Sequence, residues 1–354
     1  MTVARRHILP FFIPHLGCPN QCIFCDQRTI AGAERPPTPD DVWARLAELP
    51  AEAEQAPELA FYGGSFTALA ADVQEAYLRP AAQAIREGRI CGIRLSTRPD
   101  AIDADVLALL QHYGVGTVEL GVQSMTDEVL RLARRGHSSE DAVRALRLLQ
   151  QAGLTAGVQL MPGLPGETHH SALAGARRIL SLRPDMLRIY PTVVIEGTEC
   201  AELYRRGVYR PLTLDEAAAV TLDIRIMAEA LGVQVIRMGL QPSDGLAGRV
   251  VAGPYHPAFG SLVNSLWWRG KLLYMLDKYD NVVKMFVNRR DLPSVVGQNR
   301  QNLPYYQAKV PRLQIKTREL PFGAVLAMTA DGAEHLLGDE EWRERRLAGI
   351  LAAL

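Results

Sequence analysis

Three cysteines near the start of the chain share one short segment, Cys18-x3-Cys22-x2-Cys25, in the sequence IPHLGCPNQCIFCDQRT. Thiolates bind iron–sulfur clusters, and three on one loop can hold three corners of a four-iron cluster, which leaves the fourth iron open to an outside ligand. The alternatives are a zinc site with a distant fourth ligand and purely structural cysteines. Zinc loops usually show a second Cys or His pair downstream, whereas Cys91 and Cys200 stand alone, so the spacing favours a [4Fe–4S] cluster.

Further polar residues follow the later apolar runs of the chain. They are Gly63, Gly64, Ser65 and Thr67 in FYGGSFTAL, Ser96 and Arg98 in LSTRPDAID, Glu119 and Gln123 in ELGVQS, Arg135 in RRGH, Gln159 in VQLMPGLPGET, and Arg188 and Tyr190 in RIYP. Glycines allow unusual backbone dihedrals and close approach, and the other side chains offer hydrogen bonds. Taken singly, a buried Gln or a turn Arg is usually structural. Their recurrence at successive strand ends is what makes them candidates for one site.

The elements that position these residues are predicted from the alternation of apolar runs and amphipathic stretches. Strands are expected at 7–13, 58–62, 91–96, 116–121, 155–161, 185–190 and 233–238, and helices near 40–49, 69–87, 101–113, 138–152, 168–182 and 214–231. Strand–helix alternation with short connections implies an α/β fold with a parallel sheet. We expect a partial (β/α)6 TIM-like barrel, with a doubly wound sheet as the alternative. In a barrel the chemistry lies on the loops after the strands, where the polar residues occur.

These motifs resemble the radical S-adenosylmethionine (SAM) superfamily. The C-x3-C-x2-C loop with an aromatic residue, Phe24, before its last cysteine is the first sign. YGGSFT, STRPD, ELGVQS, MPGLPGET and RIYP…GT…LYRRGVYRP are similar to the branch that contains the Elongator catalytic subunit and, more distantly, oxygen-independent coproporphyrinogen oxidase. The similarity covers about residues 7–240. It implies that Cys18, Cys22 and Cys25 bind the cluster and that SAM chelates the open iron, where an electron cleaves it to methionine and a 5′-deoxyadenosyl radical.

The resemblance also implies roles for the residues at the strand ends. Those expected to contact SAM are Phe24, Gly63, Gly64, Ser65, Thr67, Ser96, Arg98, Gln123, Arg135, Gln159 and Tyr190. The Gly-Gly pair would hold the SAM amino group, Ser96 the ribose region, and Gln123 with Arg135 the methionine end. Gln159 departs from the coproporphyrinogen oxidase pattern, which has an acid there. Arg188 and Tyr190 would line the mouth above SAM.

Another departure concerns the second half of the chain. The Elongator subunit carries an acetyltransferase domain after its radical domain, but residues 240–354 show no Arg/Gln-x-x-Gly-x-Gly pyrophosphate loop. Acetyl-CoA chemistry is therefore not expected of these residues. We expect a barrel over 1–241, a Gly/Pro-rich linker or covering segment over 242–281, and a small basic α+β domain over 282–354.

The small domain is basic where the whole chain has no net charge. Residues 282–319 hold eight bases against the acids Asp291 and Glu319; the bases are Lys284, Arg289, Arg290, Arg300, Lys309, Arg312, Lys316 and Arg318. A basic module is the footprint expected for a phosphate-rich partner. Its predicted strand–helix–helix–strand order resembles the core of a KH RNA-binding module, whose GxxG loop grips the nucleic-acid backbone. Gly297 is present in that turn, but Arg300 replaces the second glycine.

These observations favour a radical SAM enzyme that modifies RNA, with a tRNA base as the expected target. The residues expected to bind the RNA are Arg289, Arg290, Gly297 and Arg300. The alternatives are a radical SAM oxidoreductase on a small molecule or tetrapyrrole, and a non-catalytic iron–sulfur or RNA-binding protein. An electron donor for the cluster is a further expected partner. No apolar run reaches the length of a membrane span, and the clustered cysteines suit a reducing compartment, so the cytoplasm is the expected location.

Overall fold

The main sheet of the protein has seven parallel strands. The structure is a computed structural model, and it describes residues 7–27, 35–52, 55–242 and 244–354. Neighbouring strands follow the order of the chain. They are β1 (Ile8–Phe12), β2 (Glu58–Tyr62), β3 (Gly92–Thr97), β4 (Val115–Gln123), β5 (Thr155–Leu160), β6 (Met186–Ile189) and β8 (Gln234–Met238). This order has no reversal, so the sheet is the curled half-barrel that the sequence predicts and not the doubly wound alternative.

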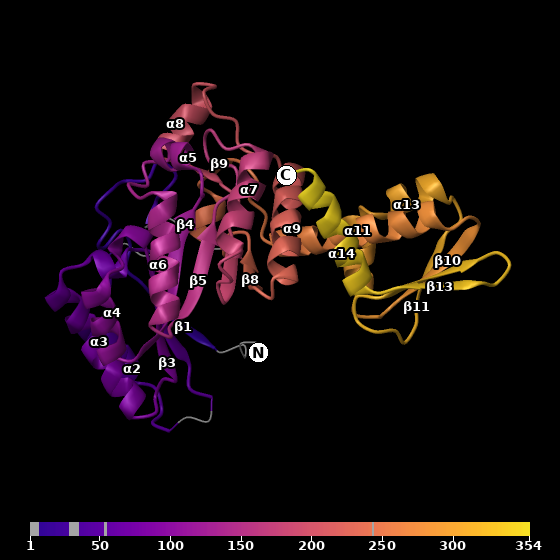
Figure 1. The fold of residues 1–354 in the computed structure, drawn as a ribbon. Helices are drawn as coiled ribbons and strands as arrows, with labels where there is room; N and C mark the ends of the chain where they lie inside the picture. Colours follow the sequence, from indigo (N-terminus) through magenta and orange to yellow (C-terminus); the bar gives the residue numbers. More distant parts are fainter. Residues whose placement is uncertain (1–6, 28–34, 53–54, 243) are drawn as a thin grey trace.

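Helices connect the strands of the half-barrel (Figure 1). They are α2 (Pro39–Ala47), α3 (Ala71–Arg86), α4 (Ala104–His112), α5 (Asp127–Leu132), α6 (Ser139–Gln151), α7 (His169–Leu180), α8 (Glu199–Arg205) and α9 (Leu214–Ala230). Capping boxes begin four of them, at Thr38, Ser138, Thr168 and Thr213, where the side chain accepts a hydrogen bond from the third helical residue. Among the described residues, no helix is long and apolar enough to cross a bilayer.

The half-barrel has the expected strands and two helices that were not expected. The apolar run at 233–238, the seventh expected strand, forms β8 and pairs with β6 along the edge. The short helices α5 and α8 were not predicted as elements. Each is no more than two turns long, too short for a hydrophobic period to stand out in the sequence.

The segment after β8 crosses the loop side of the sheet before a long helix begins. It contains α10 (Asp244–Ala247) and β9 (Val250–Ala252), and β9 pairs with the short strand β7 (Val194–Ile195) that follows β6. Then α11 (Phe259–Lys278) packs against α9. Helix α11 therefore joins the half-barrel to the C-terminal unit, which projects from one side in Figure 1.

The C-terminal unit is a four-stranded mixed sheet with two short helices. In chain order its elements are β10 (Val282–Val287), α12 (Leu292–Val296), α13 (Leu303–Lys309), β11 (Gln314–Thr317), β12 (Val325–Thr329) and β13 (Glu334–Leu337). The strand–helix–helix–strand order predicted over 282–320 is present, and β10 pairs in parallel with β11. Strands β12 and β13 and the final helix α14 (Asp339–Ala352) were not predicted. Helix α14 returns to pack against α9.

Candidate radical SAM site

The three cysteines of the motif lie on the loop after β1, whose backbone is tightly turned. Cys18 N–H donates to the His15 carbonyl and Cys25 N–H to the Cys22 carbonyl. Cys18 is exposed, Cys25 is partly exposed and Cys22 is buried. Burial, and then the neighbouring Cys22 and Cys18, raise the pKa of the Cys25 thiol to about 12. The three thiols are thus close enough to repel one another as thiolates, and a bound cation would remove that repulsion.

The loop borders a cavity of about 510 Å³ at the surface of the half-barrel. It is lined by His15, Cys18, Pro19, Asn20, Gln21, Cys25, Asp26 and Gly197. In the described part of the chain, no three His, Cys, Asp or Glu side chains converge on one metal ion. Cys18 and Cys25 border the cavity. Thiolates in such a place suit an iron–sulfur cluster, in which each thiolate binds one iron.

The Gly-Gly segment after β2 holds the cysteine loop in place. His15 N–H donates to the Gly63 carbonyl over 3.0 Å, and Ser65 N–H donates to the Leu16 carbonyl over 2.9 Å. A Cβ at Gly64 would lie 2.4 Å from the Leu16 carbonyl oxygen, so only glycine lets the two segments meet so closely. The Ser65 hydroxyl lies 3.6 Å from the Cys18 sulfur.

Ser65 therefore stands directly beside a thiol of the motif. Thr67 is buried behind it, where its hydroxyl bonds that of Thr97 over 2.6 Å. Thr67 thus ties the end of β2 to the end of β3.

Arg135 reaches the loop from the segment after α5. Its Nη1 donates to the Cys22 sulfur over 3.2 Å and its Nη2 to the Gly121 carbonyl over 2.7 Å, while its Nε is buried without a partner. Arg98 is buried and paired with Asp100, and it donates to the Arg135 carbonyl over 2.7 Å. In this arrangement Arg98 positions the segment that carries Arg135.

The residues expected on the later strands face the concave side of the sheet. Gln159 Nε2 donates to Gln123 Oε1 over 3.1 Å, and Gln123 has a positive φ of 68° where β4 bulges against β5. The Ser96 hydroxyl donates to the Phe61 carbonyl over 3.4 Å. The Tyr190 hydroxyl accepts from Arg188 Nη1 over 3.1 Å. Among the residues that the structure describes, the Gln123 amide nitrogen and the Gln159 oxygen have no side-chain partner, so both could bind a ligand.

Phe24 lies away from the cavity, in an apolar cluster that also contains Cys22, Val129, Cys200 and Tyr209. It is 7 % exposed in this structure. The backbone of Cys200 donates to the Ile23 carbonyl over 2.8 Å, which fixes α8 against the loop. Burial raises the pKa of the Cys200 thiol to about 12, as expected for a thiol in an apolar cluster.

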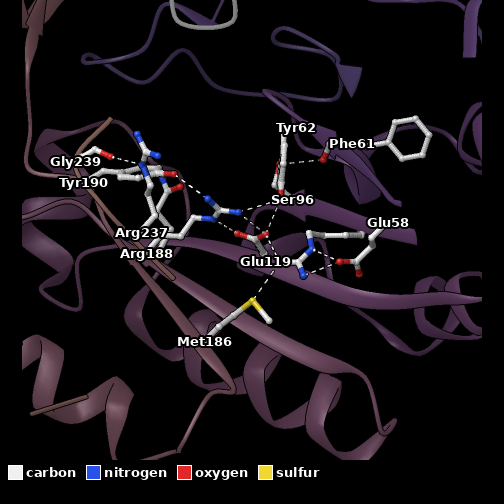
Figure 2. Close-up of polar contacts among 12 residues, drawn as sticks. Glu58, Phe61, Tyr62, Ser96, Glu119, Met186, Arg188, Tyr190, Arg237 and Gly239 are labelled. Carbon is white, nitrogen blue, oxygen red and sulfur yellow. Dashed lines mark hydrogen bonds and ion pairs between the residues drawn. The ribbon is translucent and has the colours of Figure 1, made fainter. Parts of the chain in front are cut away.

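A buried ion network fills the concave side below these residues (Figure 2). Arg94 donates to Glu58 over 2.8 Å and to Glu119 over 3.0 Å. Arg188 also bonds Glu119, and its Nη2 donates to the Tyr62 hydroxyl over 3.0 Å. Burial would raise the pKa of Glu119, but the bonds and charges of Arg188 and Arg94 outweigh burial and hold that pKa below its ordinary value.

Sequence reasoning did not find Glu58 and Arg94. A signal was present, since each is a charged residue inside a short apolar strand, where an unpaired charge is costly. Buried charges in adjacent strands are expected to pair.

The residues proposed for RNA contact lie in two segments of the C-terminal unit, Arg289 and Arg290 between β10 and α12, and Gly297 and Arg300 directly after α12. Arg289, Arg290 and Arg300 are exposed, and none has an ion-pair partner within the described part of the chain. Gly297 has a φ of 77° and lies between α12 and the turn. Asn299 and Arg300 also have positive φ, of 50° and 60°, so the turn adopts left-handed geometry without a second glycine.

The turn is held by contacts with α11, while Gln298, Asn299 and Arg300 in the turn are exposed. Asn302 donates to the carbonyl and hydroxyl of Ser265 on α11, over 3.0 and 2.9 Å. Tyr305 is half exposed, with the Arg269 guanidinium 4.4 Å from its ring centre, whereas Tyr306 is buried. Of the two tyrosines, only Tyr305 can offer a face to a base. Lys309 is paired with Asp277 and Arg318 with Glu334, so the positive charges of these two side chains are already neutralised.

Comparison with known proteins agrees with this site. Residues 12–177 match the family described as the radical SAM superfamily, and residues 184–268 match the radical SAM C-terminal domain. The tRNA uridine(34) acetyltransferase of Methanocaldococcus infernus is 34% identical over 226 residues, 58% of this chain and 42% of the relative. Elongator complex protein 3 of Danio rerio is 30% identical over 191 residues, 48% of this chain and 34% of the relative.

The fold has a counterpart among solved structures. The Elp3 structure of Methanocaldococcus infernus superposes with a TM-score of 0.60 at 27% identity, covering 78% of this chain and 64% of that one. The chain spans about two fifths of the length of the first curated relatives. The two family matches together cover the cysteines and the strand-end residues and extend into α11.

Proposed function

Since the chain belongs to the radical SAM superfamily, we propose that it binds a [4Fe–4S] cluster at Cys18, Cys22 and Cys25 and cleaves SAM there to modify RNA, with a tRNA base as the target. When bound, such a cluster supplies the electron that cleaves SAM to methionine and a 5′-deoxyadenosyl radical. One observation carries the proposal: the cysteine loop is hydrogen-bonded to the Gly-Gly segment and touched by Arg135, which brings the thiols and the expected SAM ligands together.

The protein's own groups would bind and orient SAM. Arg135 places a positive charge and a hydrogen-bond donor beside the Cys22 sulfur. Ser65 and the backbone of Gly63 and Gly64 lie beside the cysteine loop, where an amino group would find acceptors. The Gln123–Gln159 pair offers one amide donor and one acceptor toward the cavity side of the sheet.

RNA is the proposed substrate on two grounds. Relatives named for tRNA uridine(34) share the half-barrel with this chain. The exposed and unpaired Arg289, Arg290 and Arg300 supply positive charges suited to phosphates. An electron donor to the cluster and a reducing, cytoplasmic setting belong to the same proposal, because the thiols must stay reduced to bind iron.

The experiment is anaerobic reconstitution of the full chain with iron and sulfide. We expect about four irons per chain, as three thiols and an open corner imply. With SAM and a reductant, 5′-deoxyadenosine should form, and unfractionated tRNA should change its rate. Cys22→Ala should lose iron and SAM cleavage, while Cys91→Ala, which alters an exposed cysteine outside the motif, should keep both.

Two results would contradict parts of the proposal. Tightly bound zinc without iron would remove the cluster assignment. SAM cleavage that is indifferent to tRNA, in a protein that does not bind tRNA, would remove RNA as the substrate. The small-molecule or tetrapyrrole alternative would then take first place.

A further inference from the structure

One arginine on the concave side of the half-barrel has no counter-charge. In the ion network, Glu58 and Glu119 balance Arg94 and Arg188. Arg237 on β8 is different: its Nε donates to the Gly239 carbonyl and its Nη2 to the Leu240 carbonyl, both over 3.1 Å. Carbonyl groups satisfy donors but do not cancel a charge. Arg237 forms no ion pair with any carboxylate of the described residues, and its Nη1 has no partner there.

Strand register places Arg237 on the same face as the proposed SAM ligands. Gly121 pairs with Gln159, Gln159 with Arg188, and Arg188 with Arg237, across β4, β5, β6 and β8. The pairing of Arg188 with Arg237 follows a register shift, because β8 has one extra residue, Ile236, after the Leu187–Val235 pair. Beyond the shift, register partners in a parallel sheet point their side chains to one face. Arg188 points to the concave face, where it meets Glu119, so Arg237 points there as well (Figure 2).

Arg237 also lies at the open end of this row. It is partly exposed, unlike the buried Arg94, and β8 is the edge strand of the sheet. A substrate that meets SAM over β4 and β5 must occupy the remaining concave space toward β6 and β8. Arg188 on β6 is already paired with Glu119, so the charged group beyond it, on β8, is the guanidinium of Arg237.

We propose that Arg237 binds a phosphate group of the nucleotide that is modified, and so positions that nucleotide in the half-barrel. The proposal rests on the proposed function, since it names the part of an RNA substrate that this site recognises. A guanidinium is a planar, permanently charged fork of donors that binds phosphate oxygens, and at Arg237 one arm of this fork, Nη1, has no partner among the described residues. Backbone carbonyls already hold its Nε and Nη2, so the group is pre-oriented with Nη1 directed to the ligand.

The test compares uridine 5′-monophosphate with uridine as ligands of the reconstituted full chain, in the presence of SAM. A single charge-assisted bond should make the monophosphate bind about tenfold more tightly or better. Arg237→Gln should reduce this preference to less than threefold, and Arg237→Lys should leave it intermediate, because lysine keeps the charge but loses the fork. Arg177→Gln, at an exposed position on the outer helix α7, is the matched control and should behave as the parent.

A second measurement uses unfractionated tRNA at several salt concentrations. Arg237→Gln should lower the slope of log affinity against log salt by about one, the loss of one phosphate contact. SAM binding and iron content should not change, which separates the effect from damage to the site. Inorganic phosphate serves as a competitor and should displace the monophosphate only from proteins that keep Arg237.

The outcomes separate this inference from the proposed function. If the parent binds tRNA but Arg237→Gln leaves both the phosphate preference and the salt slope unchanged, the inference is overturned and the RNA function stands. If the parent does not bind tRNA yet prefers the monophosphate through Arg237, the inference holds for a small nucleotide substrate and the RNA function falls. A parent that shows no phosphate preference at all overturns the inference.

Discussion

Arg135 Nη1 lies 3.2 Å from the Cys22 sulfur, although the two residues are 113 positions apart in the chain. The same guanidinium donates to the Gly121 carbonyl. The contact joins the cysteine loop to the segment after α5 and, through Gly121, to β4. It makes the charge on the cysteine loop depend on a residue outside the motif.

Replacing Arg135 by glutamine should make the cluster harder to reduce. A hydrogen bond and a positive charge on a cluster thiolate favour the reduced, more negative form, so their loss lowers the reduction potential. The variant should also lose about 2 kcal/mol of unfolding free energy, from the buried charge-assisted bonds. A redox titration followed by electron paramagnetic resonance measures the first effect. An unchanged or higher potential, with iron content intact, would contradict the role given to Arg135.

Substitution of Gly64 by alanine should disturb the cysteine loop. A Cβ there would lie 2.4 Å from the Leu16 carbonyl oxygen and 2.7 Å from that of Ile13, both of which are backbone atoms that cannot move alone. We expect reduced iron incorporation and a melting temperature lower by several degrees. Gly116→Ala is the control, because nothing lies within 4 Å of a Cβ at that position. Full iron content in Gly64→Ala would show that the loop does not depend on this contact.

Stability should depend on pH through Glu167, which caps the loop after β5. Burial raises the pKa of Glu167 to about 7, even though Ser124 and the Gly163 N–H donate to it. The folded protein therefore binds this proton more tightly than the unfolded chain, whose pKa is near 4.5. Protonated Glu167 therefore contributes to the free energy of unfolding below about pH 4.5, and this contribution is lost as pH rises through about 7.

Glutamine at this position removes the titration. Glu167→Gln should thus gain stability relative to the parent between about pH 5 and 8, with the gain largest at the alkaline end. Thermal unfolding across this range measures the difference. Subtracting the variant from the parent cancels other titrating groups, such as His137, whose burial lowers its pKa to about 4. A difference that does not change with pH would show that Glu167 stays ionised throughout.

Reversing Arg289, Arg290 and Arg300 to glutamate should nearly abolish tRNA binding and leave tRNA-independent SAM cleavage intact. The three charges lie on the C-terminal unit, away from the cysteine loop (Figure 1). Parent affinity should fall steeply with salt, because phosphate contacts release counterions. Filter binding at several salt concentrations measures both effects. The control reverses Arg86, Arg147 and Arg177, which are exposed on the outer helices of the half-barrel; equal losses in both triple variants would mean that only net charge matters.

The sequence predicts the half-barrel well, because parallel strands with buried faces appear as short apolar runs between amphipathic helices. It is less informative about β12, β13 and α14. Strand β13 alternates exposed and buried positions over only four residues, and α14 is rich in charge with few apolar positions, so neither gives a clear period.

The candidate site divides in a similar way. The cysteine spacing and the Gly-Gly segment are local signals, and a sequence displays them directly. The pairing of Glu58 with Arg94 and the position of Arg237 depend on strand register, and the contact of Arg98 with the Arg135 carbonyl depends on how two loops meet. Such relationships between distant residues are not written in any one segment of the chain.

The two helices that flank the C-terminal sheet have a mechanical consequence. Helix α11 leads into the sheet, α14 leads out of it, and both pack against α9; Arg343 and Arg346 on α14 pair with Glu229 and Asp223 on α9. A domain attached through a single linker can change its orientation, whereas two packed helices hold the C-terminal unit at a fixed distance from the half-barrel. Under the proposed function, an RNA bound at Arg289, Arg290 and Arg300 would then present to the cysteine loop only the nucleotide that lies at a fixed distance from that contact, and this distance, in place of the neighbouring sequence, would select the nucleotide.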